Sequence, residues 1–187
     1  GQKLDKLSLG TEVQAIAAQQ RIEAANWQVS AIETKRVKRR PSPPFTTSTL
    51  QQEASRKLGF SASRTMQIAQ KLYEGVNLGS ETTGLITYMR TDGVQMSFEA
   101  IGQIREAIGQ TFGTDFVPSQ PRVYTTQAAN AQEAHEAIRP TSIWRHPDEV
   151  RKRLDFEQFR LYELIWKRTI ASQMADAQLD QTAADLS

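Results

Sequence analysis

The sequence predicts a mainly α-helical protein with a minor β part. Several stretches place apolar residues at the 3.6-residue spacing of a helix, with Ser or Thr before them and Gly after them. Two stretches, near the two ends, alternate apolar with polar residues as strands do. We therefore predict a helical domain at residues 45–174, which carries a helix-turn-helix-like pair and Tyr88. It is inserted into a small β-containing domain formed by residues 1–44 and a return strand at 175–187.

The composition limits the classes of protein that fit. The chain has 187 residues, 39% of them hydrophobic and 24% charged, which is typical of a soluble globular protein with a real core. A net charge of only +2 excludes a protein that coats DNA by overall basicity, so any nucleic-acid contact must be local. The absence of cysteine excludes disulfides and thiolate metal sites, and no apolar run is long enough to predict a transmembrane helix.

The first 44 residues predict a helix, a strand and a stiff connector. Thr11 can cap a helix that ends by Asn26, and alternation from Trp27 to Val37 predicts a strand. The prolines of Pro41–Pro44 lack N–H groups and favour an extended crossing between domains. The strand runs into five cations that precede the crossing: Lys35, Arg36, Lys38, Arg39 and Arg40. They fit either a DNA backbone, with binding that weakens as salt rises, or a solvated strand edge that prevents aggregation.

Two short amphipathic helices are expected next. The hydroxyls of Thr46, Thr47 and Ser48 can cap a helix that Gly59 ends, and Ser61 can cap a second helix that Gly75 follows. Such pairs occur in many proteins that never contact DNA, so the pattern alone is weak evidence for DNA binding. We interpret Met66 and Tyr73 in the second helix as core residues.

A short apolar run then leads to a tyrosine. Gly84 to Tyr88 predicts a strand that ends at the phenol, where substrate can reach it. Arg90 follows two residues later and can hold a phosphate oxygen by paired hydrogen bonds, so Tyr88 is a candidate nucleophile towards a phosphodiester. The alternative is a strand end with a hydrogen-bonded phenol and no chemistry.

The remaining elements are mostly helical. Ser97 caps a periodic helix that Gly113 ends, and Phe156 to Met174 predicts the longest helix. Between them Asn130 to Arg139 is expected to form a short helix ended by Pro140, which would place His135 and Arg139 on one face.

Three segments in order resemble the type IA DNA topoisomerases, and bacterial topoisomerase I in particular. They are PSPPFTTSTLQQ (41–52), GLITYMRTDG (84–93) and NAQEAHEAIRPT (130–141), and the resemblance extends from about Trp27 to Met174. Reverse gyrase and topoisomerase III are relatives within the same class. One departure is visible: the family pattern usually has serine where this chain has Gly93, which removes a hydroxyl and loosens the backbone.

The resemblance implies a role for each candidate residue. Tyr88, Arg90 and His135 are the predicted catalytic residues, with Arg90 stabilising charge at the phosphate and His135 moving a proton. Asp92 would orient Arg90 or a neighbouring backbone group, and Arg139 would bind phosphate. The predicted DNA-binding residues are Thr87, Asp92, Arg139, Lys35, Arg36, Lys38 and Arg39, and no metal ligand is predicted.

The resemblance also implies partners. The expected substrates are single-stranded DNA and negatively supercoiled DNA, cleaved through a 5′-phosphotyrosine and resealed without ATP. Mg2+ is expected only in a full enzyme, whose N-terminal metal-binding domain this chain lacks, so we expect an inactive fragment of a cytoplasmic, nucleoid-associated bacterial enzyme. The β part would belong to a hinge or arch, and flexing is expected at Pro41–Pro44 and near Ala175. The rival functions are a non-catalytic helix-turn-helix DNA-binding module and a structural domain that binds a protein partner.

Overall fold

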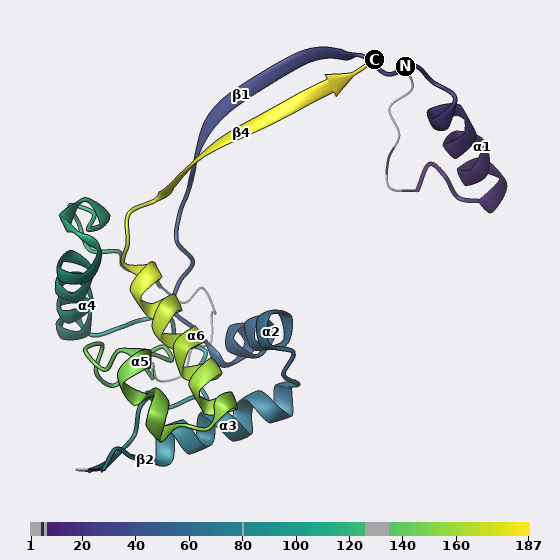
Figure 1. Cartoon of the computed structure of the whole chain (residues 1–187). Coiled ribbons are helices and arrows are strands. Elements are labelled where there is room, and N and C mark those ends of the chain that lie inside the picture. Colours follow the sequence, from purple (N-terminus) through teal and green to yellow (C-terminus); the bar gives the residue numbers. More distant parts are fainter. Residues whose placement is uncertain (1–4, 6, 80, 126–134) are drawn as a thin grey trace. The chain divides into compact units, whose positions relative to one another are not determined.

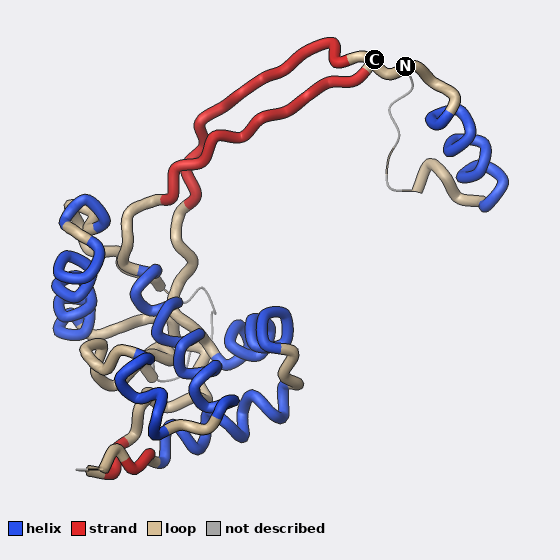
Figure 2. The backbone as a smooth tube through the Cα atoms, in the orientation of Figure 1, coloured by secondary structure: helices blue, strands red, loops and turns tan. Residues whose placement is uncertain are grey.

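The computed structural model describes residues 5, 7–79, 81–125 and 135–187. The chain divides into two compact units (Figures 1 and 2). Unit 1 comprises Gly1–Val37 and Gln178–Ser187, and unit 2 comprises Lys38–Ala177. Helices predominate, as the sequence predicts. The domain boundaries at residues 44 and 174, and the insertion of one domain into another, stay predictions.

Unit 1 consists of one helix and a two-stranded ribbon. Thr11 caps helix α1 (Glu12–Glu23) through a capping box with Gln14. Strand β1 (Val29–Arg39) pairs with strand β4 (Ala177–Leu186), and Gln28 and Ser187 exchange both backbone hydrogen bonds at 3.0 Å, which is the antiparallel pattern. The predicted strand and return strand are therefore confirmed. None of the described residues of unit 1 is buried, so this unit has no hydrophobic core of its own in this chain.

Unit 2 begins with the predicted helix pair. The Thr46 hydroxyl caps α2 (Thr47–Leu58) and the Ser61 hydroxyl caps α3 (Ala62–Glu74), as the sequence predicts. Both helices pack against α6 (Phe156–Ser172) as well as against each other (Figure 1). The remaining elements of this unit are β2 (Val76–Asn77), β3 (Thr82–Thr83), α4 (Phe98–Phe112), η1 (Thr114–Phe116), α5 (Pro147–Val150) and η2 (Arg151–Arg153). β2 and β3 form a small antiparallel hairpin.

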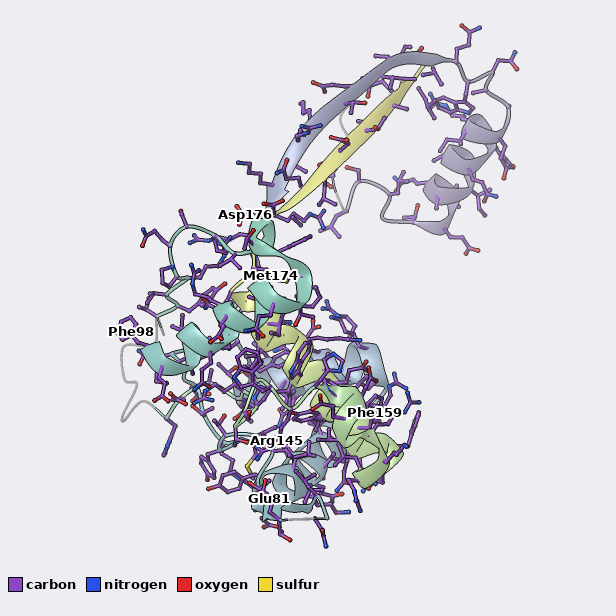
Figure 3. The ribbon with its side chains drawn as sticks, turned by 60° about the vertical axis from the view of Figure 1, so that its left-hand side comes forward. Glu81, Phe98, Arg145, Phe159, Met174 and Asp176 are labelled. Atoms are coloured by element: carbon purple, nitrogen blue, oxygen red, sulfur yellow. The ribbon has the colours of Figure 1, made fainter. Side chains whose placement is uncertain are left out.

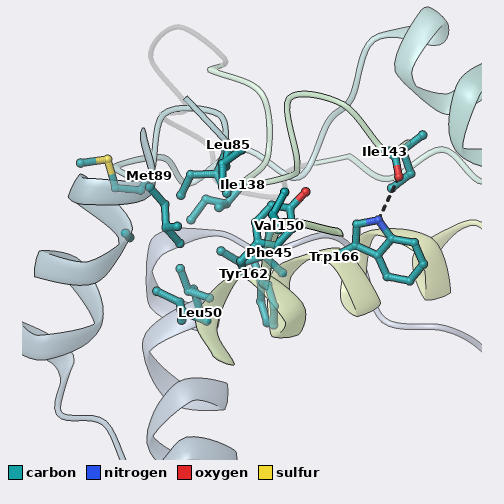
Figure 4. Packing of buried hydrophobic residues seen from close by; sticks show 14 of the residues in the cluster. Phe45, Leu50, Leu85, Met89, Ile138, Ile143, Val150, Tyr162 and Trp166 are labelled. Atoms are coloured by element: carbon teal, nitrogen blue, oxygen red, sulfur yellow. Dashed lines mark hydrogen bonds between the residues drawn. The ribbon is translucent and has the colours of Figure 1, made fainter. Parts of the chain in front are cut away.

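The core of unit 2 gathers around α6. Phe45, Leu50 and Tyr162 are fully buried there, together with Leu85 and Ile138 from the extended segments (Figure 4). Two of the aromatic residues in this core carry polar groups, and both groups are hydrogen-bonded. The Tyr162 hydroxyl donates to the Arg145 carbonyl at 2.7 Å, and the Trp166 indole N–H donates to the Ile143 carbonyl at 2.9 Å.

The proline segment is anchored to unit 2. Pro44 is buried, the Pro41 carbonyl accepts a hydrogen bond from the Tyr124 hydroxyl at 3.2 Å, and the Pro43 carbonyl accepts one from Arg168 at 3.4 Å. The division between the units falls instead between residues 37 and 38 and between residues 177 and 178. Arg122 joins the loop after η1 to the end of α6: its N–H donates to the Gln173 side chain at 3.1 Å, and its guanidinium donates to the Met174 carbonyl at 2.8 Å.

Ion pairs fasten the loops of unit 2. Arg145 and Glu81 meet at 3.0 Å, and Arg122 and Asp176 meet at 2.5 Å. Figure 3 labels Glu81, Arg145 and Asp176 among the side chains of this unit. These pairs join segments that are distant in sequence, so they limit how the loops around α6 can move. Within the described residues, no helix combines the length and the apolar character that crossing a membrane requires.

Candidate functional site

The segment that carries Tyr88 is extended, but it is not a strand. Residues 84–88 form only one isolated bridge, between Ile86 and Pro140, so the strand prediction is wrong. The physical reason is that its N–H groups bond to different elements: Leu85 donates to the Leu72 carbonyl of α3 at 2.7 Å, and Thr87 donates to the carbonyl of residue 139 at 2.9 Å. The apolar pattern of this segment therefore reflects burial against several neighbouring elements, and not pairing with a second strand.

Buried residues hold Tyr88 from both sides while its own ring stays accessible. Leu85, Ile86 and Met89 are 0–1% exposed, whereas Tyr88 is 36% exposed. Since three neighbours are fixed in the core, the backbone of Tyr88 is rigid although its phenol can be reached from solvent. This is the combination that a nucleophile on a scaffold requires.

Two aromatic rings contact the ring of Tyr88. The Tyr73 ring lies 5.5 Å away, edge-on, and the His135 ring lies 5.3 Å away, tilted by 57°. Both distances suit favourable aromatic contacts. Tyr73 is 40% exposed, so its interpretation as a core residue is wrong. A Cβ on Gly84 would lie 2.5 Å from the Tyr73 carbonyl oxygen, so glycine is required for α3 to approach the tyrosine segment this closely.

The histidine segment is extended as well. Residues 135–140 contain no helix, and Ile138 bridges to Phe45 while Pro140 bridges to Ile86. The helix prediction is therefore wrong for these residues, and residues 130–134 lie outside the described part of the chain. The reason is that the buried backbone finds its hydrogen bonds across to neighbouring segments, which outweighs local helix propensity. His135 and Arg139 consequently do not share a helical face.

Thr87 joins the tyrosine and histidine segments. Its hydroxyl donates to the Ala137 carbonyl at 2.7 Å and accepts from the Arg139 N–H at 3.0 Å. The hydroxyl is thus occupied by backbone groups of the neighbouring segment. In this structure Thr87 fixes the two candidate motifs relative to each other.

A second set of contacts fixes the backbone of His135. The Thr91 hydroxyl donates to the His135 carbonyl at 3.2 Å and accepts from the Gly93 N–H at 2.9 Å. Thr47 at the start of α2 in turn donates its hydroxyl to the Met89 carbonyl at 2.8 Å. Gly93 is buried, and its lack of a side chain allows close packing against the His135 carbonyl. The looser backbone that the sequence predicts at this glycine is not what the structure shows.

Arg139 is engaged by a neighbouring carboxylate. Its guanidinium donates to Glu136 through Nε at 2.9 Å and through Nη2 at 2.5 Å, and Nη1 donates to the Pro140 carbonyl. Glu136 also accepts from the Ser97 N–H at 2.8 Å, at the start of α4. Partial burial raises the pKa of Glu136, but the Ser97 N–H and the Arg139 charge outweigh it, so the pKa lies below its ordinary value.

Arg90 and Asp92 are both exposed, on either side of the buried Thr91. Within the described residues, no ion pair joins the two side chains. The proposed orientation of Arg90 by Asp92 is therefore not formed in this structure, and both groups are open to a ligand.

The basic segment has a mixed environment. Lys35 pairs with Glu33 at 3.0 Å and Arg36 with Asp180 at 3.4 Å, all exposed on the ribbon. Lys38 and Arg39 make no ion pair with any residue in the described ranges. Exposed ion pairs of this kind contribute little stability. Contact with a DNA backbone and a solvated strand edge therefore both stay predictions for this segment.

The donor set does not fit a metal. In the ranges that the structure describes, no three His, Asp or Glu side chains gather closely enough to hold a cation. No step of the chemistry proposed below is therefore assigned to a metal held by these residues.

Sequence reasoning missed Tyr73, Thr47, Thr91 and Glu136. Tyr73 follows the helical spacing of its buried neighbours, and the threonines act through backbone groups that no side-chain pattern reveals. Only for Glu136 did the sequence offer a clue, because a carboxylate three residues before Arg139 can pair with it. The segment that holds both residues was expected to be a helix.

The tyrosine segment, the histidine segment and the helix pair define a site within the helical unit 2. A family model described as DNA topoisomerase matches residues 1–187. The chain therefore belongs to the DNA topoisomerase family.

Individual relatives agree with this result. The chain is 55% identical over 185 residues to a protein of Rickettsia felis named DNA topoisomerase 1, which covers 99% of this chain and 24% of that protein. It is 54% identical over 190 residues to one of Xylella fastidiosa with the same name, covering 100% of this chain and 23% of that protein. The solved structure of full-length topoisomerase I from Thermotoga maritima matches with a TM-score of 0.73 and 42% identity, over 91% of this chain and 27% of that one. The resemblance to bacterial topoisomerase I is thus confirmed, and the chain spans about a quarter of these relatives.

Proposed function

We propose that this chain is the tyrosine-bearing part of a type IA DNA topoisomerase, in which Tyr88 cleaves one DNA strand. The observation that carries the proposal is the accessible phenol of Tyr88, 36% exposed, in contact with the imidazole of His135 on a rigid backbone. Family membership over the whole chain supports it. The ring contact places an imidazole beside the ring of Tyr88. In this proposal His135 takes the proton that the phenol must lose before its oxygen attacks phosphorus.

The proposed reaction exchanges one phosphoester for another. The Tyr88 oxygen forms a bond to phosphorus, the bond from phosphorus to the 3′-oxygen breaks, and a 5′-phosphotyrosine results. The phenol gives up one proton and the leaving 3′-oxygen gains one. Because the ester bond is conserved, the 3′-hydroxyl can attack the phosphotyrosine and reseal the strand without ATP.

The remaining site residues take supporting roles in this proposal. Arg90 is exposed two residues from Tyr88 and is free to bind the phosphate and stabilise its developing charge. Asp92 would orient Arg90 once DNA is bound, and His135 would carry the proton. Arg139 would bind phosphate. In this structure its guanidinium is paired with Glu136, which holds it in place. Lys35, Arg36, Lys38 and Arg39 would contact the DNA backbone farther away.

For the whole enzyme we propose relaxation of negatively supercoiled DNA, with single-stranded DNA as the cleaved substrate. The remaining three quarters of the relatives' length would supply the other domains, including a domain that binds Mg2+. The helical domain would be inserted in a hinge or arch domain and would act as the gate, and by itself it would be inactive.

The experiment is a cleavage assay with the full-length protein that contains this chain, Mg2+ and labelled single-stranded DNA. A denaturing gel reports the covalent adduct. We expect an adduct with the wild type and none with Tyr88→Phe, because phenylalanine keeps the ring and lacks the nucleophilic oxygen.

Tyr73→Phe is the matched control, since its ring lies only 5.5 Å from that of Tyr88. It should keep the adduct. An adduct that survives Tyr88→Phe and disappears with Tyr73→Phe would move the nucleophile to the neighbour. Unchanged DNA binding with no adduct in any variant would favour the non-catalytic DNA-binding module.

A further inference from the structure

A basic pocket lies between the C-terminal end of α2 and one face of α6. It is lined by four cations (Lys57, Arg160, Lys167 and Arg168), one carboxylate and three aliphatic side chains. None of these residues belongs to the tyrosine site. The pocket is therefore a separate feature of unit 2, which the function proposed above does not use.

Positive charge is concentrated in this pocket. Four lining cations against the single carboxylate of Glu163 give a surplus of three, whereas the whole chain carries a net charge of +2. Glu163 pairs with Lys167 at 2.7 Å. The rest of the chain is thus slightly acidic, so the pocket is a local concentration of positive charge.

Glu53 beneath the pocket does not remove the surplus. Its side chain is 10% exposed and is shared by three cations: Lys57 at 2.7 Å, Arg168 at 3.5 Å, and Arg56. Counting Glu53 and Arg56 together leaves the surplus at three. Burial, followed by the nearby Arg168 and Arg56 charges, lowers the pKa of Lys57 even though Lys57 pairs with Glu53.

The guanidinium of Arg168 is fixed before any ligand arrives. It lies 4.4 Å above the ring of Phe45 and donates to the Pro43 carbonyl at 3.4 Å, with its side chain 17% exposed. Arg160 contacts the Phe156 ring at 5.5 Å and donates to the Lys57 carbonyl at 3.5 Å. It pairs with no carboxylate among the described residues. One arginine is thus rigid and another is available, which suits planar paired hydrogen bonds to a phosphate.

We propose that this pocket binds a backbone phosphate of a nucleic-acid strand, at a second contact separate from the Tyr88 site. The aliphatic side chains of Leu58, Leu164 and Ala171 would lie against the sugar next to that phosphate. The choice of nucleic acid as ligand rests on the proposed function. The second contact would hold DNA on unit 2 while a strand is cleaved elsewhere.

The test measures DNA binding by the full-length protein in a Tyr88→Phe background, so that no covalent complex forms. The double variant Arg160→Gln/Lys167→Gln removes two pocket charges, and the control Arg21→Gln/Lys152→Gln removes two exposed charges outside the pocket. The slope of log K against log salt is measured with a single-stranded and with a duplex oligonucleotide. Thermal melting confirms that both variants are folded.

Each lost phosphate contact should lower the slope by about 0.7 for a single strand and about 0.9 for a duplex. The pocket variant loses the one phosphate contact proposed, so its slope should fall by about 0.7 with a single strand or by about 0.9 with a duplex, and the control should lose less than half of that. Equal slopes in the two variants, or no DNA binding by the parent protein, overturn the proposal.

A polyglutamate peptide tests the main competing ligand. If the pocket variant binds this peptide more weakly while its DNA slope is unchanged, the pocket serves an acidic protein segment and the proposal is wrong. The adduct assay of Tyr88 is independent of these slopes. Failure of the cleavage proposal and failure of the pocket proposal can therefore be told apart.

Discussion

The backbone of Gly93 lies against the backbone carbonyl of His135, so closely that a Cβ atom on Gly93 would be 2.1 Å from that oxygen. No side chain fits in this space, because the obstacle is backbone rather than the end of a flexible side chain. The hydroxyl of Thr91 bonds to both residues and closes the contact. The contact joins the tyrosine motif to the histidine motif, and any residue larger than glycine must separate them.

Gly93→Ala should therefore destabilise the protein by about 1–3 kcal/mol, as overpacking of a tight site does. It should also slow adduct formation, because the added methyl group displaces His135 from the ring of Tyr88. Thermal unfolding and the adduct assay measure the two effects. Gly93→Ser should behave similarly.

Gly102→Ala is the matched control for this substitution. Gly102 is an exposed glycine in α4, and a Cβ there meets no atom within 4 Å. Alanine should stabilise the helix by about 0.5–1 kcal/mol and leave adduct formation unchanged. Equal effects of the two alanines would contradict the packing role of Gly93.

Local signals account for the helices that the sequence predicts correctly. The hydroxyls of Thr46, Ser61 and Ser97 each cap the helix expected after them, because a cap acts on backbone groups three residues away. The strand at the C-terminal end was also predictable, from the rising polarity and the faint alternation after Ala175.

The candidate site is harder to predict, because its segments are held by contacts between distant parts of the chain. Gly84–Tyr88 and His135–Pro140 read locally as strand and helix, yet their backbone bonds cross to α3 and to each other. The residue types made Tyr88 a candidate, and the resemblance to the family motifs added His135. Neither revealed that the ring of Tyr73 completes the aromatic group.

Tyr73→Leu should reduce the rate of adduct formation, by up to about tenfold. The substitution removes an edge contact with the Tyr88 ring that is worth about 0.5–1.5 kcal/mol. Tyr73→Phe keeps the ring and should remain near the wild-type rate. If leucine and phenylalanine give the same rate, Tyr73 does not position Tyr88.

Thr87→Val should destabilise the protein by about 1–3 kcal/mol. Valine has the shape of threonine but leaves the Ala137 carbonyl and the Arg139 N–H without their partner. Thr87→Ser, which keeps the hydroxyl, is the control. It should lower the free energy of unfolding by less than valine does, as measured by chemical denaturation. If the Thr87 hydroxyl serves mainly to bind DNA, valine will weaken DNA binding and leave stability unchanged.

Glu136→Gln should lower the melting temperature at pH 7 and lose that effect in acid. The pKa of Glu136 is lowered in the folded state, so the folded protein binds fewer protons than the unfolded one between the two pKa values. Its contribution to stability is therefore present above the unfolded pKa and is lost as the pH falls through the folded pKa.

The measurement compares wild type and Glu136→Gln by thermal unfolding from pH 7 down to pH 3. The two melting temperatures should converge at the acidic end, where the carboxylate no longer accepts from Ser97 and Arg139 as a charged group. Glu106→Gln, an exposed carboxylate on α4, is the control and should show a much smaller difference at pH 7. A difference between wild type and Glu136→Gln that persists unchanged at pH 3 would show that packing, rather than charge, gives Glu136 its role between α4 and the histidine segment.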